Sequence, residues 1–470
     1  MKKGTLTIIV GMLLVALTTR AGGLMTNTNY HIAFDRMMAR GATFDVDAVY
    51  SNPAGMVWNE HEGWQLSLNF QKPWQNRDIE TTVPGFLAMP GVYNGYNIDQ
   101  KFEGKASAPI VPALFATYKK DRWAVGAMLG IVGSGGFVQY DEGVPLFNVL
   151  TMAKIFQSTA TLSPANAVTP EQYAMDSEMK GKQYIFGGQL DFSYQITDFL
   201  SAAVGMRANY YDGYYRGHVT AVHNQLNAPL VDLQLDCLQR GWGFAPIVGV
   251  DVHTGAFTLA ARYEFRTKIS TENDTKQLDA KILNPASMAT GTPAYIEGAA
   301  ALSQFGDKVA PYEDGAQTRY DMPAMLSVAV GYEFTPKLRA TAEYHFFDDK
   351  NAKMAGDRQK TLEGGTNEFL LGLEYDINDK FTVSCGGQRT DYGLSDDYQQ
   401  HTSFACDSYS VGLGGAVQLN DQLRLNVGYF MSIYSDYTKK QANYQGTPYA
   451  GTDIFSRTNY VVGVGIDYKF

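Results

Sequence analysis

Residues 460–470 read YVVGVGIDYKF, and this stretch decides the fold because its side chains alternate between two kinds. Tyr460, Val462 and Val464 begin an apolar row that continues to Phe470, and the positions between them are mostly small or polar. Successive side chains of a strand point to opposite faces of a sheet, so a period of two predicts a strand with one apolar face. Residues 423–433 and 338–346 repeat the pattern.

About fourteen such stretches follow one another, and the joins between them alternate between short and long. The predicted strands are roughly 64–72, 110–119, 121–132, 183–195, 199–211, 243–252, 256–267, 322–334, 337–347, 367–377, 380–390, 408–419, 422–433 and 458–470. The predicted long loops are roughly 73–109, 133–182, 212–242, 268–321, 348–366, 391–407 and 434–457. The short joins, such as residues 196–198 and 378–380, have turn-forming residues.

This pattern predicts an all-β protein: a transmembrane antiparallel β-barrel of about 14 strands. Strands of about ten residues suit a tilted bilayer crossing, whereas strands of soluble proteins average about five or six. Short turns on one rim and long loops on the other are typical of bacterial outer-membrane barrels. The sheet has to close, because lipid offers no hydrogen-bond partners to a free edge.

The first residues predict export. Lys2 and Lys3 precede an apolar run over residues 6–17, which ends in small and polar residues. These features are typical of a secretory signal peptide, which we expect to be removed near Ala21. A membrane anchor is the alternative, but crossing a bilayer takes about 20 apolar residues. We therefore expect a signal peptide at 1–21, a separate N-terminal segment at 22–62 and a barrel at 63–470.

Composition narrows the function classes. The net charge of −10 argues against nucleic-acid binding, and the aromatic content of 13%, rich in Tyr, suits a membrane boundary. Three Cys do not build a disulfide framework. Cys385 and Cys406 are one candidate pair, with Cys237 left over; the alternative is that all three are small apolar core residues.

Residues 22–62 lack the period of two. Ile32, Phe34, Met37 and Met38 lie near helical spacing, and the later run Asn52-Pro53-Ala54-Gly55-Met56 has turn chemistry. A segment this apolar needs shelter from water, and the barrel lumen provides it. We therefore predict a plug inside the barrel.

The same residues resemble the hatch of the FadL-like family of outer-membrane transporters for long-chain fatty acids and other hydrophobic compounds. The resemblance rests on 21–24, on 52–56, on the predicted strand ending at 261–268, on Asp321-Met322-Pro323-Ala324 and on the closing residues 457–470. It implies a monomeric barrel in the outer membrane of a Gram-negative cell. It also implies an N-terminal hatch and uptake of a fatty acid or an aromatic hydrocarbon, released sideways into the lipid of that membrane.

Candidate site residues follow from the resemblance and from apolarity. Asn52, Pro53 and Ala54 match the hatch motif, and the family's side opening falls in the third strand, where Gly126, Gly130 and Gly133 lie. Phe470 ends the last predicted strand, and we expect it to act as an assembly signal for the barrel-assembly machinery; the alternative is an apolar residue at the rim. The candidate ligand-binding residues, chosen for apolarity, are Phe34, Met37, Met38, Phe44, Phe147, Leu150 and Phe156. Lys182, Arg207 and Arg339 are candidate partners for a carboxylate.

Three other functions compete with transport of a hydrophobic molecule. The seven His are scattered, and neither a nucleophile motif nor metal-ligand spacing emerges, so we expect no enzyme, no metal and no cofactor. A general porin would need an open polar lumen. A surface adhesin would use the long Tyr- and Asn-rich loops.

Overall fold

The structure, a computed structural model, describes residues 30–470 except 109, 161–162, 164, 166 and 291. The predicted signal peptide at 1–21 and the first residues of the predicted hatch, 22–29, lie outside the described residues.

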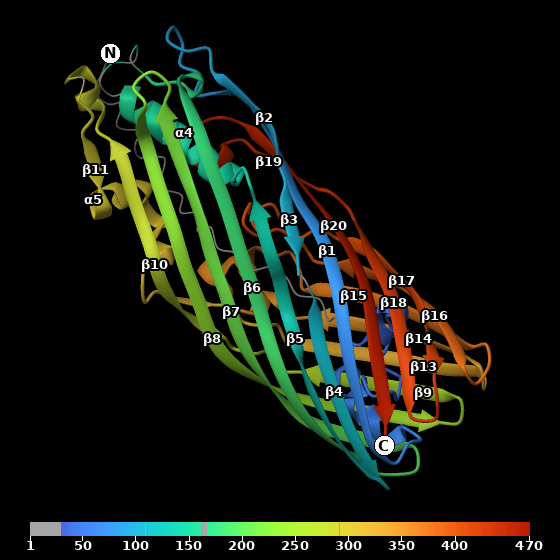
Figure 1. The fold of residues 1–470 in the computed structure, drawn as a ribbon. Helices are drawn as coiled ribbons and strands as arrows, with labels where there is room; N and C mark the ends of the chain where they lie inside the picture. The colour runs from blue at the N-terminus through green and yellow to red at the C-terminus, as the bar shows by residue number, and fades with distance from the viewer. Residues whose placement is uncertain (1–29, 109, 161–162, 164, 166, 291) are drawn as a thin grey trace.

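Fourteen antiparallel strands form a closed barrel, which confirms the predicted fold class (Figure 1), and six further strands of the described residues extend it. The strands are β1 (Gly63–Phe86), β2 (Tyr96–Phe102), β3 (Gly104–Ser107), β4 (Val111–Lys120), β5 (Trp123–Tyr140), β6 (Tyr173–Gln195), β7 (Leu200–His223), β8 (Ala228–Thr254), β9 (Phe257–Glu264), β10 (Ser270–Leu283), β11 (Tyr295–Glu297), β12 (Gln317–Arg319), β13 (Met325–Thr335), β14 (Leu338–Phe347), β15 (Thr366–Asp376), β16 (Phe381–Asp391), β17 (Ser408–Gln418), β18 (Leu423–Tyr434), β19 (Tyr437–Gln441) and β20 (Gly451–Lys469).

The wall order is β1, β4–β9, β13–β18 and β20, and the β20–β1 ladder closes the ring. The other strands extend this wall toward the long loops. The helices are α2 (Ile32–Arg36), α3 (Ala48–Ser51), α4 (Pro145–Ala160) and α5 (Gly298–Leu302), with 3-10 turns η1 (Pro53–Trp58), η3 (Pro170–Gln172), η4 (Pro285–Thr290), η5 (Ser303–Lys308), η6 (Ala310–Tyr312), η7 (Asp349–Asn351), η8 (Ala355–Thr361) and η9 (Tyr444–Gly446).

The wall turns its apolar face outward. On β6, Leu190 is 68% exposed and Phe192 is also exposed, whereas Gln189 and Asp191 on the opposite face are buried. A soluble barrel would have the reverse arrangement. An outward apolar face around a polar interior is the arrangement of a barrel that crosses a membrane.

Aromatic residues mark the two edges of the apolar belt. Trp64, Tyr118 and Trp123 pack together at the rim that carries the short turns, which we call the short-turn rim. Tyr210 and Trp242 pack together, with ring centroids 4.6 Å apart, toward the other end, the long-loop rim. Aromatic side chains suit a membrane–water boundary, so these two levels delimit the belt.

Several of the predicted long loops are partly wrong, because strands occupy part of their length. The region 212–242 is almost entirely β7 and β8, which meet at a tip over residues 224–227. Beyond the belt, outward positions such as Arg216 and Asp236 are charged. Because strands were predicted from their apolar outer face, the predicted strands end at the membrane boundary. The hydrogen-bonded ladder of β7 and β8 continues beyond it. Residues 73–86, 133–140 and 173–182 continue β1, β5 and β6 in the same way.

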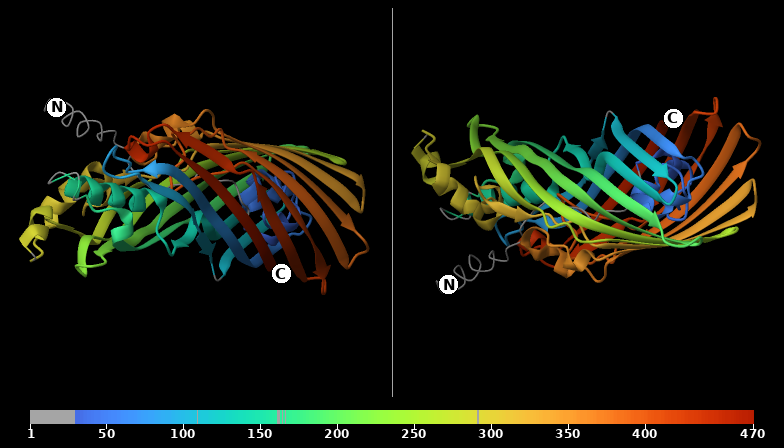
Figure 2. Two further views of the ribbon diagram at one scale, coloured as in Figure 1. Left: turned by 90° about the horizontal axis from the view of Figure 1, so that it is seen from above. Right: turned by 90° about the horizontal axis from the view of Figure 1, so that it is seen from below.

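The N-terminal segment, residues 30–62, lies inside the barrel at the short-turn rim, and strands surround it in both end views (Figure 2). Its helices contact strands on several sides of the wall. The apolar loop stretch from Val144 to Phe156 forms most of α4, at the long-loop end (Figure 1). Among the described residues, no helix is long and apolar enough to cross a membrane.

All three cysteines are free. Cys237 and Cys406 are buried in one apolar cluster among the outer loops, as apolar core residues. Cys385 is exposed on the outer wall, so the alternative pair with Cys406 is not formed.

We predict that Leu371→Lys destabilises the barrel by about 2–4 kcal/mol, because it places a charge on the lipid face near the middle of β15. Leu371 is 66% exposed and lies in the outward-facing apolar row of β15 with Phe369 and Leu373. The measurement is urea unfolding in lipid vesicles. Leu226→Lys, in the exposed tip between β7 and β8, is the control, expected within about 0.5 kcal/mol of wild type. Equal costs for both variants would contradict a lipid-facing position for Leu371.

Candidate functional site

The Asn-Pro-Ala motif fastens the N-terminal segment to β7 and β8. The Asn52 side chain caps η1 by accepting the Ala54 N–H, and its amide donates to the carbonyl of Val250 at 3.2 Å. Ser201 Oγ of β7 donates to the Ala54 carbonyl at 2.7 Å. Pro53 begins η1, where its fixed φ suits the first turn. The motif thus satisfies its own backbone and joins it to the wall.

A second attachment lies on β14. Glu343 accepts the backbone N–H groups of Arg40 and Gly41, each at 2.8 Å. Its other oxygen contacts His345 Nε2 at 2.7 Å, and Nδ1 of that ring contacts Glu368 at 2.9 Å. This buried polar chain ties the turn at residues 40–41 to β14 and β15.

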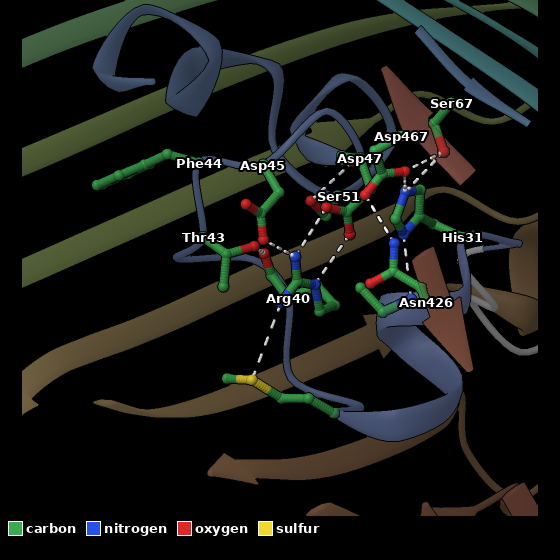
Figure 3. A network of polar contacts seen from close by, with 12 residues as sticks. His31, Arg40, Thr43, Phe44, Asp45, Asp47, Ser51, Ser67, Asn426 and Asp467 are labelled. Carbon is green, nitrogen blue, oxygen red and sulfur yellow. Dashed lines mark hydrogen bonds and ion pairs between the residues drawn. The ribbon is translucent and has the colours of Figure 1, made fainter. Parts of the chain in front are cut away.

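A polar network inside the N-terminal segment keeps that turn in shape (Figure 3). Arg40 donates to Asp47 through Nε at 2.9 Å and Nη2 at 2.8 Å, and to Asp45 at 2.7 Å. His31 joins the start of the segment to the wall, because its Nε2 contacts Asp467 at 3.1 Å and Ser67 at 2.9 Å.

Two carboxyl groups of this segment, Asp35 and Asp45, have pKa values shifted in opposite directions. Burial opposes ionisation of Asp45, but the Arg40 guanidinium outweighs it and lowers the pKa of that carboxyl. Burial raises the pKa of Asp35 well above its usual range. Asp35 Oδ1 accepts a hydrogen bond from Gln71 at 3.2 Å. The Arg40 guanidinium therefore stabilises the ionised form of Asp45, whereas burial disfavours ionisation of Asp35.

A third attachment involves Tyr50 of α3. The guanidinium carbons of Arg207 and Arg262 lie 5.5 and 5.3 Å from the centre of its ring, within the range of cation–π contacts. Glu264 forms ion pairs with both arginines. All three charged side chains are buried, so each guanidinium has a carboxylate partner where water is scarce.

An apolar lining lies beside these polar attachments. We call it the luminal apolar cluster: Val46, Ala48, Val49, Tyr50, Met56 and Val57 of the N-terminal segment, and Ala113, Phe115, Ala124, Met128, Val132, Ile185, Tyr211, Ile269, Tyr320 and Met322 of the wall and loops. Our sequence analysis missed the wall residues. Their signal is present, because Phe115 and Met128 are large apolar residues on strand faces where the pattern otherwise places small or polar ones.

The wall ladder is interrupted next to this cluster. The β4–β5 ladder ends at the pair Leu114–Leu129, and pairing to β5 resumes in β3 at Ala106–Val138. Opposite this stretch, the β5–β6 register shifts twice, between Ile131 and Gly136. Ala108, Val111 and Ile131 form a small apolar cluster here, with Tyr30 from inside and Tyr184 of β6 packed against it.

The three predicted opening glycines have different positions. Gly130 and Gly133 lie in the interrupted stretch of β5. Gly126 pairs with Thr117 inside the regular ladder, and a Cβ there would come within 2.5 Å of Met56 and Val49. Gly126 therefore gives the N-terminal segment room at the wall. Phe470 is exposed at the short-turn rim, where its N–H donates to the Trp64 carbonyl.

The seven candidate ligand residues are not brought together. Phe34 and Met38 pack with Leu370 of β15, and Met37 lies against Gly372. Phe44 packs on His253 near the short-turn rim. The remaining three, Phe147, Leu150 and Phe156, are in α4 at the long-loop end. Phe156 is buried among outer loops and Phe147 packs against a second loop cluster. They define an inner and an outer group rather than one pocket.

The three basic candidates for a carboxylate already have acidic partners. Lys182 pairs with Asp212, Arg207 with Glu264, and Arg339 with Glu374 and Asp376. In the part of the chain that the structure describes, no group of three or more His, Cys, Asp or Glu side chains is arranged to hold a metal ion.

Comparison with known proteins places the fold. No protein-family model and no curated protein sequence matches the chain. Solved structures do. A FadL homologue of Pseudomonas aeruginosa superposes with a TM-score of 0.64 at 15% identity, over 96% of this chain and 100% of that one. The Pseudomonas putida toluene transporter TodX gives 0.58 at 11% identity, over 96% and 100%. The Ralstonia pickettii toluene transporter TbuX gives 0.52 at 13% identity, over 94% and 98%.

The protein is thus a membrane-spanning β-barrel with its N-terminal segment inside the lumen and an interruption in one wall. Its fold is that of the FadL-like transporters, as the sequence resemblance predicts. TodX and TbuX, two of the structures named above, are toluene transporters.

We predict that Gly41→Ala loosens the attachment at β14. A Cβ at this position would lie 2.6 Å from Glu343 Oε1 and 2.9 Å from the Ala329 Cβ. The carboxylate would have to move away from the Arg40 and Gly41 N–H groups, at a cost of about 1–3 kcal/mol. Thermal unfolding in lipid vesicles measures this cost. Gly364→Ala is the matched control, since a Cβ there meets nothing within 4 Å. A Gly41→Ala barrel as stable as the control would show that this contact is dispensable.

Proposed function

We propose that the protein is an outer-membrane transporter that takes up hydrophobic small molecules and releases them sideways into the bilayer. Residues 22–62 act as its hatch, and long-chain fatty acids are the proposed substrates. The observation that carries the proposal is the interrupted β4–β5 ladder, which borders the luminal apolar cluster on one side and the lipid-facing wall on the other.

The position of the interruption favours sideways release. An apolar molecule leaving toward the short-turn rim would have to pass the polar network around Arg40 and Glu343. At the interruption, Ala108, Val111 and Ile131 offer an apolar surface through the thickness of the wall. Moving apolar surface from one apolar setting to another avoids the cost of exposing it to water.

A movable hatch would allow the barrel to release a ligand that it binds tightly. Burying a methylene group contributes about 0.8 kcal/mol, so a pocket that encloses ten of them binds by roughly 8 kcal/mol. Release from such a site needs a second state of lower affinity. The N-terminal segment contributes Val49, Tyr50 and Met56 to the luminal apolar cluster, so its displacement would change the lining itself.

The substrate has two candidates. Two of the solved structures named above are toluene transporters, so an aromatic hydrocarbon is the alternative to a fatty acid. A general porin is less consistent with the fold, because the N-terminal segment is bonded to β1, β7, β8 and β14 across the lumen. We further propose that the barrel works as a monomer and is inserted by the barrel-assembly machinery.

We predict that pinning the hatch to the wall abolishes uptake. Ala54→Cys with Gly249→Cys places the two Cβ atoms about 3.6 Å apart, within the range for a disulfide, and the new Cβ at position 249 displaces Asn52 Oδ1, which lies 2.5 Å from it. The measurement is entry of labelled oleate and of labelled glucose into cells that make only this barrel. We expect oleate entry without glucose entry for wild type, and at least about tenfold slower oleate entry when the disulfide is formed.

The same variant treated with a reductant is the matched control, since it carries both substitutions without the bond, and oleate entry should return. Unchanged oleate entry in the oxidised form would rule out hatch movement. Glucose entry without preference for oleate would make the barrel a general porin.

A further inference from the structure

One charged side chain interrupts the lipid-facing row of β1. Phe70 and Trp74 are 44% and 45% exposed on this face, and Lys72 lies between them. Its pairing partner on β20, Val462, also faces lipid, as does Ile110 beside the start of β4. A lysine on the lipid face of a barrel is unfavourable, so its presence there points to a function.

The ammonium of Lys72 lies at the wall interruption. Its Nζ donates to the carbonyl of Ala108 at 2.9 Å, and Ala108 belongs to the apolar cluster that fills the break between β3 and β4. Nζ also lies 5.7 Å from the centre of the Trp74 ring. Lys72 therefore sits on the outer edge of the break rather than simply extending toward the membrane surface.

Lys72 differs in its partner from the three basic residues that the sequence proposed for a carboxylate. Lys182, Arg207 and Arg339 are neutralised by carboxylates. Among the described residues, no ion pair with a carboxylate is formed by Lys72, whose Nζ donates to the Ala108 carbonyl. An ammonium has three donors, and a neutral carbonyl is a weaker partner than an anion. The site thus has one positive charge without an acidic neighbour, at the lipid side of the opening.

We propose that Lys72 binds the carboxylate of the ligand as it crosses the wall interruption. The barrel then favours anionic amphiphiles over neutral molecules of the same chain length. The inference rests on the proposed function, because it requires that ligands leave at this break. A carboxylate entering hydrocarbon alone is strongly disfavoured. Lys72 exchanges its bond to the Ala108 carbonyl for a charge-assisted bond to the departing head group, which then moves with it toward the Trp74 level.

The test compares two ligands that differ only in the head group. Entry of oleate and of oleyl alcohol is measured for wild type, Lys72→Met, Lys72→Arg and Arg389→Gln. We expect Lys72→Met to slow oleate entry about tenfold, the effect of losing one charge-assisted hydrogen bond. Oleyl alcohol entry should stay within about twofold of wild type, and Lys72→Arg should restore oleate entry. Arg389→Gln removes a positive charge from the outer end of β16, away from the break, and should change neither.

The outcomes are distinguishable. If oleate and oleyl alcohol slow equally in Lys72→Met, the lysine only supports the broken wall, and the inference is overturned. If neither slows, Lys72 only anchors the barrel to lipid head groups, which also overturns it. If wild type transports neither ligand, the proposed function itself fails. Folding is checked by thermal unfolding, in which Lys72→Met should stay close to wild type, because removing a charge from the lipid face offsets the loss of the bond to the Ala108 carbonyl.

Discussion

The rest of the structure depends on one constraint: hydrocarbon cannot hydrogen-bond a peptide group, so the sheet has to close on itself. The β20–β1 ladder meets this requirement over most of the length of both strands. Against that background an interruption is costly and needs compensation. The break between β3 and β4 has it, because small apolar side chains fill the gap and the ammonium of Lys72 donates to the carbonyl of Ala108.

Closure also creates an interior that must be filled. The N-terminal segment fills it and makes two kinds of contact with the wall, polar and apolar. Polar contacts from Asn52, Arg40 and His31 fix its position on opposite sides of the wall. Apolar contacts from Val49 and Met56 complete a lining next to the break. A segment held by a limited number of specific bonds can have a second position, whereas one buried in a continuous apolar core could not.

The sequence predicted the fold well because strand alternation is a local property, and each of the fourteen predicted strands overlaps a strand of the wall. The strand ends were predicted less well, since β7 and β8 continue beyond the belt with charged outward faces.

The site was predicted only in part. Gly130 and Gly133 lie at the break, but Phe34 and Phe156 lie far from each other in the fold because apolarity alone does not indicate which residues meet. The sequence shows Lys72 as a charge in an apolar row. Its position at the break could not be predicted, because only the pairing of β1 with β3 and β4 brings Ala108 close to it.

The most direct test of the central claim, that a hydrophobic ligand crosses the wall at this break, is to find where it touches the protein in transit. A fatty acid with a photoreactive group at the end of its chain is bound to the barrel in lipid vesicles and illuminated, and the labelled residues are found by mass spectrometry. The account predicts labels on Ala108, Val111 and Ile131, and on Phe115 and Met128 of the adjoining lining. Labels confined to Arg339, Asp376 and their neighbours, near the short-turn rim, would show that the ligand leaves along the barrel axis and would contradict it.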